Sequence, residues 1–239
     1  MNAEPKRALI TGASQRIGKA ISEALHKEGY DLLLHFNSNE TAAQAICDTL
    51  NAARANSAQL TQADLSSKNE LNDLIAFAKN WGNIALLINN AASFNDDLAI
   101  DPIQFSTNAS HPYELALALS ESLGRSNGLV INLLDIYANK PKQGFAHYSA
   151  SKAAAQSYTL SLAQHLAPHA RANGIAPGAI LWPEDEVDSE HQRAKILSQV
   201  PLKRAGSPED IVKAVFFLIE SDYVTGQVIT VDGGRSLNL

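Results

Sequence analysis

Several kinds of residue and segment are scarce in this 239-residue chain, and each scarcity excludes a class of protein. The single cysteine, Cys47, excludes an intramolecular disulfide and a multi-cysteine metal site, which fits a reducing compartment and a cytoplasmic location. No run of about 18 apolar residues is present, so the sequence predicts no membrane span. Lys and Arg number 19 against 25 Asp and Glu, a net charge of -6, and the basic residues are scattered. We therefore expect neither a membrane nor a nucleic acid as a partner.

The histidines do not show a metal-binding pattern either. Metal sites need ligands at recurring short spacings, backed by acids or by further histidines. No such spacing occurs here, so we predict no metal and assign the histidines packing or solvated roles by default. The residues concerned are His35, His111, His147, His165 and His169.

Apolar residues, by contrast, make up 45% of the chain and fall into short continuous runs that alternate with longer helical patterns. Continuous apolar runs are typical of strands buried on both faces. The sequence therefore predicts an α/β fold, a Rossmann-type doubly wound parallel sheet with helices on both faces, in one domain over residues 1–239. The expected strands are Ala8–Ile10, Asp31–His35, Ala58–Thr61, Ile84–Ile88, Leu129–Leu133, the β-poor stretch His169–Ile175, and Val228–Val231.

The turn after the first expected strand contains two glycines and opens a helical pattern. It reads Thr11-Gly12-Ala13-Ser14-Gln15-Arg16-Ile17-Gly18. Backbone N–H groups in such a turn can approach a pyrophosphate, and the dipole of the following helix favours its charge. A Gly/Ser turn before a helix also has a purely structural interpretation, but its place after the first strand favours a dinucleotide site.

The tip of the second strand, His35-Phe36-Asn37-Ser38, carries no acid. A protein selective for NAD places Asp or Glu there to bind the ribose 2′-hydroxyl. Asn37 and Ser38, with Arg16 nearby, suit a 2′-phosphate better. The sequence therefore predicts NADPH as the cofactor, with a plain polar turn as the alternative.

Lys152 lies four positions after Tyr148 in a helical pattern, which places the two side chains on one face of the helix. A cation beside a phenol stabilises the phenolate and lowers the pKa of the hydroxyl, so Tyr148 becomes a usable general acid near neutral pH. A lone Tyr-x-x-x-Lys pattern arises often by chance, so it indicates a catalytic pair only when other motifs accompany it.

With those companions the chain resembles the short-chain dehydrogenase/reductase superfamily along nearly its whole length. The matching motifs are Thr11-Gly12…Gly18, Ala63-Asp64-Leu65, Asn89-Asn90-Ala91, Asn108, Tyr148…Lys152, Pro177-Gly178 and Val231-Asp232-Gly233-Gly234. The resemblance implies that Tyr148 donates a proton, that Lys152 binds the nicotinamide ribose, and that Asn108 holds a water linking Lys152 to solvent. It also implies a homotetramer. The expected cofactor contacts are Gly12, Ser14, Arg16, Ile17, Gly18, His35, Phe36, Asn37, Ser38, Asp64, Leu65, Asn90, Ala91, Ala92, Tyr148, Lys152, Pro177, Gly178 and Ile180.

Two departures from the superfamily pattern resemble the pteridine reductase family. Arg16 replaces the middle glycine of the first loop, and Asp135 stands thirteen residues before Tyr148, where a serine is usual. A carboxylate can engage the amino-pyrimidine side of a pterin or relay a proton to a ring nitrogen. Phe94 can stack on a pterin, and Arg16 can bridge it to a cofactor phosphate. Structurally, Asp135 could instead cap a turn, and Phe94 could anchor a loop.

The leading functional prediction is an NADPH-dependent pteridine reductase that transfers a hydride to a dihydropterin or dihydrofolate C=N bond. The alternatives are a 3-oxoacyl-type carbonyl reductase and a catalytically silent NADP-sensing protein. The expected catalytic residues are Asp135, Tyr148, Lys152 and Asn108. Arg16, Phe94, Asp135, Tyr148 and Trp182 are the expected substrate contacts, and residues 179–200 form an expected substrate-covering flap with Trp182 over the substrate.

Overall fold

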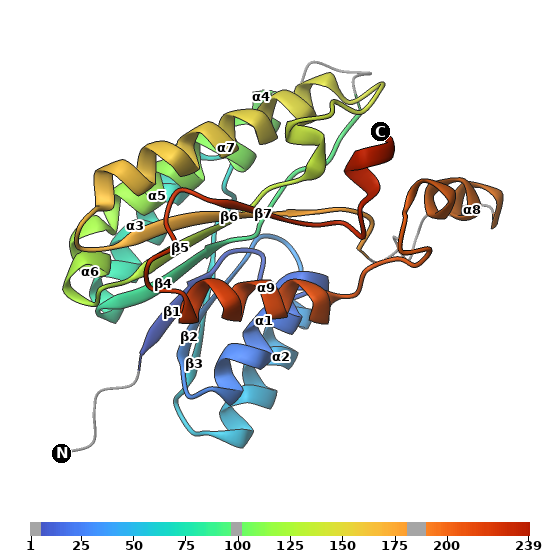
Figure 1. The fold of residues 1–239 in the computed structure, drawn as a ribbon. Coiled ribbons are helices and arrows are strands. Elements are labelled where there is room, and N and C mark those ends of the chain that lie inside the picture. The colour runs from blue at the N-terminus through green and yellow to red at the C-terminus, as the bar shows by residue number, and fades with distance from the viewer. Residues whose placement is uncertain (1–5, 97–101, 181–189) are drawn as a thin grey trace.

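A computed structural model describes residues 6–96, 102–180 and 190–239 of the chain. Its centre is a seven-stranded sheet in the order β3-β2-β1-β4-β5-β6-β7, with every neighbouring pair parallel (Figure 1). This arrangement confirms the predicted doubly wound α/β fold. The strands are β1 Arg7–Ile10, β2 Asp31–Phe36, β3 Ala58–Gln62, β4 Ile84–Asn89, β5 Leu129–Leu133, β6 Arg171–Pro177 and β7 Val228–Val231.

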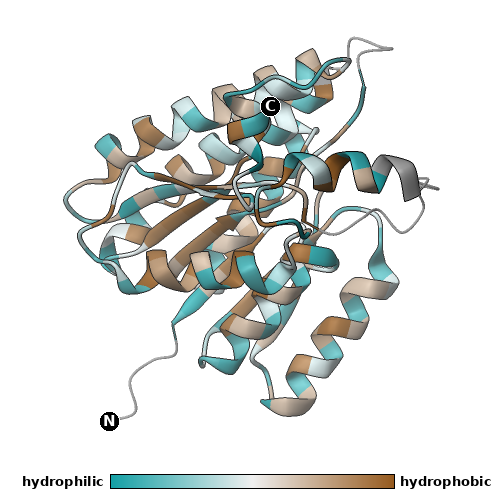
Figure 2. Ribbon diagram, turned by 45° about the vertical axis from the view of Figure 1, so that its right-hand side comes forward, coloured by the Kyte–Doolittle hydropathy of each residue, from teal (hydrophilic) through white to brown (hydrophobic). Residues whose placement is uncertain are grey.

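Helices cover both faces of the sheet, with α1, α2 and α9 on one side and α3, α5, α6 and α7 on the other (Figure 1). Successive strand residues therefore enter different cores: Ala8 and Ile10 pack toward the first group, whereas Leu9 packs toward the second. Figure 2 shows hydrophobic strands at the centre, between helices that carry both hydrophobic and hydrophilic residues. The helices are α1 Arg16–Lys27, α2 Glu40–Ala53, α3 Lys68–Trp81, α4 Pro102–Phe105, α5 His111–Ala118, α6 Ser120–Arg125, α7 Ala146–Leu166, α8 Glu190–Gln199 and α9 Pro208–Glu220.

The sixth strand is the element that the sequence predicted least well. It spans Arg171–Pro177, two residues later than expected, and it forms despite its glycine and alanines. A Cβ at Gly174 would lie 2.6 Å from Cδ1 of Leu134, so a small residue is needed where this strand passes that side chain. Packing here overrides the weak β-propensity of the sequence.

The helical pattern over Tyr113–Leu123 is divided between two helices, because α5 ends at Ala118 and α6 begins at Ser120. The expected flap, residues 179–200, contains the helix α8 near its end. Residues 181–189, which include Trp182, lie outside the described residues. In the described ranges, no helix combines the length and the apolar character needed to cross a lipid bilayer.

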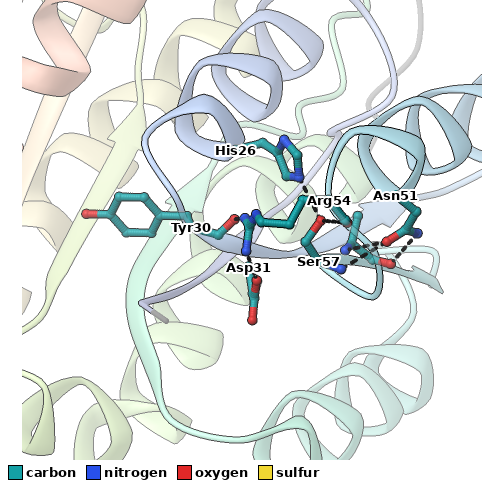
Figure 3. Close-up of polar contacts among 7 residues, drawn as sticks. His26, Tyr30, Asp31, Asn51, Arg54 and Ser57 are labelled. Atoms are coloured by element: carbon teal, nitrogen blue, oxygen red, sulfur yellow. Dashed lines mark hydrogen bonds and ion pairs between the residues drawn. The ribbon is translucent and has the colours of Figure 1, made fainter. Parts of the chain in front are cut away.

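A polar cluster fixes the amino-terminal edge of the sheet, remote from the carboxyl ends of the strands (Figure 3). Arg54, which follows α2, forms an ion pair with Asp31 at the start of β2 and donates to the carbonyl oxygen of Tyr30. The His26 Nε2 and Ser57 Oγ atoms lie 2.6 Å apart and join α1 to the chain before β3. Burial and the Arg54 charge both lower the pKa of His26, so this histidine is held neutral.

Candidate active site

A cavity of about 650 Å³ lies at the carboxyl edge of the sheet, where ligands bind in doubly wound folds. It brings together most of the residues predicted to contact cofactor or substrate, from segments far apart in the chain. Those predicted residues are Gly12, Ser14, Arg16, Ile17, Gly18, His35, Phe36, Asn37, Ser38, Asn90, Ala91, Ala92, Phe94, Asp135, Tyr148, Lys152, Pro177, Gly178 and Ile180.

The loop after β1 is packed so closely that its glycines have no room for a side chain. Gly12 adopts the left-handed conformation, with φ +63°, and a Cβ there would lie 3.0 Å from the Cα of Ala91. A Cβ at Gly18 would collide with the carbonyl oxygen of Gly12. Asn90 closes the loop from the other side by donating from Nδ2 to the carbonyl oxygens of Thr11 and Gly12, both at 2.9 Å. The bare backbone before α1 is the type of cradle that a dinucleotide pyrophosphate occupies.

Arg16 adopts a backbone conformation that favours glycine. Its φ is +49°, in the left-handed region that costs a non-glycine residue on the order of 1 kcal/mol. The loop thus retains a glycine-like path while it presents a guanidinium to the cavity. Such backbone strain is typical of functional positions, so it supports a ligand-binding role for Arg16.

His35 supports the loop from beneath. Its Nδ1 accepts a hydrogen bond from the Gly12 N–H at 3.2 Å, and its Nε2 lies 2.9 Å from the carbonyl oxygen of Ala63, to which it donates. These two contacts require the neutral imidazole with its proton on Nε2. Burial lowers the pKa of His35 to about 4. Its buried ring positions the backbone of the loop.

This pKa shift predicts that stability falls in mild acid. Below pH 6.5 the unfolded chain protonates His35, whereas the folded protein does so only near pH 4, so the folded state loses up to about 3 kcal/mol as pH falls through that window. Urea unfolding of the wild type and His35→Gln from pH 8 to 4 measures the effect. The wild type should lose stability relative to the variant below pH 6.5, and His26→Gln separates the contribution of the other shifted histidine. A difference that does not vary with pH would contradict the prediction.

Asp135 and Tyr148 form a hydrogen-bonded pair in the cavity wall. Asp135 directly follows Leu134 after β5, and Tyr148 lies in the first turn of α7. The Tyr148 hydroxyl donates to Oδ2 of Asp135 at 2.8 Å, while Oδ1 of the same carboxylate accepts from the Tyr137 N–H at 2.9 Å. Asp135 is thus both the cap of a 3-10 turn and the partner of Tyr148. Burial raises the pKa of Asp135, although these hydrogen bonds and the charges of Lys152 and Arg235 oppose the shift.

Lys152 is buried one helical turn after Tyr148, and its Nζ donates to the carbonyl oxygen of Leu133 at 2.9 Å. Burial lowers the pKa of this ammonium to about 8, and the Asp135 charge partly opposes the shift. The expectation that Lys152 lowers the tyrosine pKa is wrong for this arrangement. Burial and the neighbouring Asp135 raise the pKa of Tyr148, because its hydroxyl faces a carboxylate. Tyr148 is therefore a protonated donor paired with an acid.

Aromatic rings form the wall beside this pair. Phe94 is 48% exposed, stacks on Phe145 with ring centroids 4.7 Å apart, and meets the edge of Tyr148 at the same centroid distance. The Lys142 ammonium lies 4.8 Å from the centroid of Phe94 and 3.7 Å from that of Phe145. The Phe94 ring is thus fixed by its neighbours and partly open, as a stacking surface requires.

A protein-family model described as "Enoyl-(Acyl carrier protein) reductase" matches residues 12–236, which span nearly the whole chain and the whole cavity. The chain belongs to the short-chain dehydrogenase/reductase superfamily. Members of this superfamily are oxidoreductases that use NAD(P)H, and the glycine cradle and the Tyr148–Lys152 pair fit such a cofactor.

Individual relatives within the superfamily carry different names. "Pteridine reductase 1" of Leishmania tarentolae is 32% identical over 282 residues, covering 96% of each chain. "Uncharacterized oxidoreductase YmfI" of Bacillus subtilis is 32% identical over 237 residues, covering 96% of this chain and 98% of its own. "3-oxoacyl-[acyl-carrier-protein] reductase FabG" of Staphylococcus aureus is 31% identical over 241 residues, covering 96% and 97%. These similarities support a reductase but do not separate pterin from oxoacyl substrates.

Three predicted site residues are not in the described lining of the cavity. The Asp64 carboxylate accepts from the Ser66 N–H and caps a turn, and Leu65 is buried in the core. Asn108 lies on a π-helical turn, Ser106–Ser110, where its amide contacts both the N–H and the carbonyl oxygen of Ser93, each at 2.8 Å, and the Ser151 hydroxyl. Its recorded contacts thus join the chain after β4 to α7.

Sequence reasoning missed four cavity-lining side chains beside the Asp135–Tyr148 pair. Tyr137 and Phe145 are sequence neighbours of Asp135 and Tyr148, so proximity to those motifs could have identified them. Lys142 lies on the turn between them. Arg235 follows the Asp232-Gly233-Gly234 motif by one residue, but nothing in the sequence indicates that this segment reaches the cavity.

Proposed function

We propose that this oxidoreductase is an NADPH-dependent reductase of pterins, acting on a C=N bond of a dihydropterin or dihydrofolate. The observation that carries the proposal is the 2.8 Å hydrogen bond between the Tyr148 hydroxyl and the Asp135 carboxylate. Either substrate takes one proton after hydride addition, which the Tyr148 hydroxyl can supply, but a pterin also presents N–H groups from which a second, carboxylate group can accept. The similarity to a pteridine reductase supports the same substrate class.

NADPH, when bound, supplies the hydride. The bare backbone of Gly12 and Gly18 fits its pyrophosphate, and Asn37 and Ser38 line the cavity without an acid that would repel a 2′-phosphate. Arg16 is the cation placed to bind a phosphate oxygen there. Lys152 is placed to bind the nicotinamide ribose.

The proton route follows from the paired groups. Hydride addition to the carbon of a C=N bond leaves negative charge on nitrogen, which takes the Tyr148 proton. The Tyr148 oxygen then recovers a proton from solvent by way of Asp135, because the raised pKa of that carboxylate favours uptake of the proton before it passes to Tyr148. Asp135 returns to the carboxylate that accepts from the Tyr148 hydroxyl.

Phe94 supplies the stacking surface for a flat heterocycle in this proposal. Residues 179–200 remain the proposed flap, and three of their described residues, Ala179, Ile180 and Ile196, line the cavity. A homotetramer also remains part of the proposal.

The second candidate function is a 3-oxoacyl-type carbonyl reductase, which the similarity to the staphylococcal reductase favours. A catalytically silent NADP sensor is disfavoured, because Tyr148 and Lys152 both lie in the cavity wall.

Replacing Asp135 tests the proposed substrate directly. Asp135→Ser should lower kcat/KM for a dihydropterin by about tenfold or more, while reduction of an acetoacetyl thioester is spared or raised, because an ionised carboxylate repels a carbonyl oxygen that gains charge. Steady-state NADPH oxidation with each substrate gives the ratio of the two kcat/KM values in the wild type and in the variant. Asp135→Asn is the matched control, since its amide keeps an acceptor for the Tyr137 N–H but holds no acidic proton. An unchanged ratio in Asp135→Ser would make the carbonyl reductase the better assignment.

Cofactor preference gives a separate prediction for Arg16. Fluorescence titration should show tighter binding of NADPH than of NADH, and Arg16→Gly should weaken NADPH binding by about tenfold with little change for NADH. Glycine accepts the left-handed backbone without strain, so Arg16→Gly should unfold at a temperature no lower than the wild type. NADH binding as tight as NADPH would exclude the 2′-phosphate assignment.

A further inference from the structure

The C-terminal turn after β7 places one side chain, Arg235, in the wall of the cavity. Gly234 is left-handed, with φ +84°, and the Asp232 carboxylate accepts from the N–H groups of Gly234 and Ser236 at 2.8 and 2.7 Å. A Cβ at Gly178 would lie 2.6 Å from the Cβ of Asp232, so the turn is packed against the end of β6. Arg235 therefore projects from a preorganised backbone.

The charge of the buried Arg235 guanidinium is compensated only in part: it lowers the pKa of Asp135, and its Cζ lies 5.6 Å from the centroid of the Tyr137 ring. The residue is only 8% exposed, and Nη2 donates to the Tyr137 hydroxyl at 3.0 Å. Its Nε is buried and has no hydrogen-bond partner, and no carboxylate of the described residues forms an ion pair with it. The guanidinium thus brings a positive charge into the wall of the cavity. A buried cation with spare donors in a cavity wall is costly unless a ligand uses it.

The position of Arg235 indicates which ligand that is. Tyr137, its hydrogen-bond partner, lies two residues after Asp135, beside the groups assigned to proton transfer and not beside the phosphate cradle. A donor next to the reacting groups meets the ring that is being reduced. The carboxylates of a folate, in contrast, lie at the end of a long tail, away from that ring.

We propose that Arg235 is a specificity-determining residue that donates a hydrogen bond to the ring carbonyl oxygen of a pyrimidinone-containing substrate. This inference rests on the proposed reduction of pterins, whose bicyclic ring carries such an oxygen. A site that donates to this oxygen rejects an analogue with an amino group there, because two donors then face each other. The hydrogen bond to the Tyr137 hydroxyl orients the guanidinium.

The test compares two ligands that differ at this position. A dihydropterin carries the ring carbonyl, whereas 2,4-diaminopteridine carries an amino group in its place. Arg235→Met should raise KM for the dihydropterin by about tenfold or more, and should leave the inhibition constant of 2,4-diaminopteridine within about twofold or improve it. The dissociation constant of NADPH, measured by fluorescence, should stay within about twofold. Arg235→Lys, which keeps the charge and a donor, should recover part of the preference for the carbonyl compound.

Tyr137→Phe separates recognition from packing. It removes the hydroxyl that Arg235 contacts but leaves the guanidinium, so the variant should keep a preference for the carbonyl compound. The inference is overturned if Arg235→Met weakens both ligands equally, if it weakens NADPH in parallel, or if Tyr137→Phe reproduces its whole effect. Wild-type enzyme that reduces the acetoacetyl thioester but no dihydropterin would overturn the proposed function and this inference together, whereas the other outcomes overturn the inference alone.

Discussion

Tyr148→Phe should lower kcat for dihydropterin reduction by about 10²-fold or more, with NADPH affinity nearly unchanged. The substitution removes the hydroxyl that donates to Asp135 at 2.8 Å, and with it the proton that the proposed mechanism transfers to the substrate nitrogen. The phenylalanine ring retains the edge contact with Phe94. Single-turnover oxidation of NADPH measures the chemical step, and fluorescence titration measures the cofactor affinity.

The matched control is Tyr223→Phe, the same chemical change at a tyrosine that is fully exposed. It should leave both quantities unchanged. A Tyr148→Phe enzyme that keeps most of its turnover would show that the proton comes from elsewhere, and Asp135, held close by its bond to the Tyr137 N–H, would be the first residue to test.

Lys152→Met should abolish most activity and yet stabilise the protein in the absence of nucleotide by about 1–3 kcal/mol at pH 7. Lys152 is buried with a pKa of about 8 against 10.5 for a free lysine, so keeping its charge in the folded state costs about 3 kcal/mol. Loss of its hydrogen bond to the Leu133 carbonyl oxygen offsets part of the gain. Urea unfolding at pH 7 measures the difference in the free energy of unfolding between Lys152→Met and the wild type.

The pH dependence of that difference identifies its cause. Between pH 8 and 10.5 the folded wild type has released the Lys152 proton while the unfolded chain still binds it, so wild-type stability rises with pH. The advantage of the methionine variant should therefore shrink across this range. A variant that is less stable than the wild type, by an amount independent of pH, would mean that the ammonium is fully compensated where it lies. Functional residues that reduce stability are expected where activity requires a buried charge.

The amino-terminal half of the fold was predictable because its signals are local. The apolar runs that became β1, β2 and β4 are buried on both faces, and the glycine turn after β1 has the spacing that its close packing requires. The break at Leu119 between α5 and α6 was not predictable from periodicity, because the apolar pattern continues through it. The helix over Glu190–Gln199 was not predicted either, because this segment has too few apolar residues to show a helical period.

Within the site, the sequence motifs identified the functional residues, but they did not identify the hydrogen-bonding and charged partners that shift the pKa values of those residues. The i, i+4 spacing places Lys152 near Tyr148, yet the closest charged partner of the hydroxyl is Asp135, which lies thirteen residues earlier in the chain. Burial, and after it the Asp135 carboxylate, raises the pKa of Tyr148, and the spacing on one helix contains neither the burial nor this partner. Arg235 was missed for the same reason: its place in the cavity depends on the packing of β6 against the turn after β7.

The strand order also determines when during folding the cofactor cradle can form. The β1–β2 pairing joins segments about 24 residues apart, whereas the hydrogen bond from the Asn90 N–H to the Thr11 hydroxyl closes a loop of 79 residues. Loop-closure entropy makes the longer contact costlier by about 1 kcal/mol, and contacts of long sequence separation slow folding. An intermediate that contains only β1, β2 and β3 therefore holds the glycine loop without its Asn90 clamp. Nucleotide binding during refolding thus reports the docking of β4 rather than the earlier collapse of the first three strands.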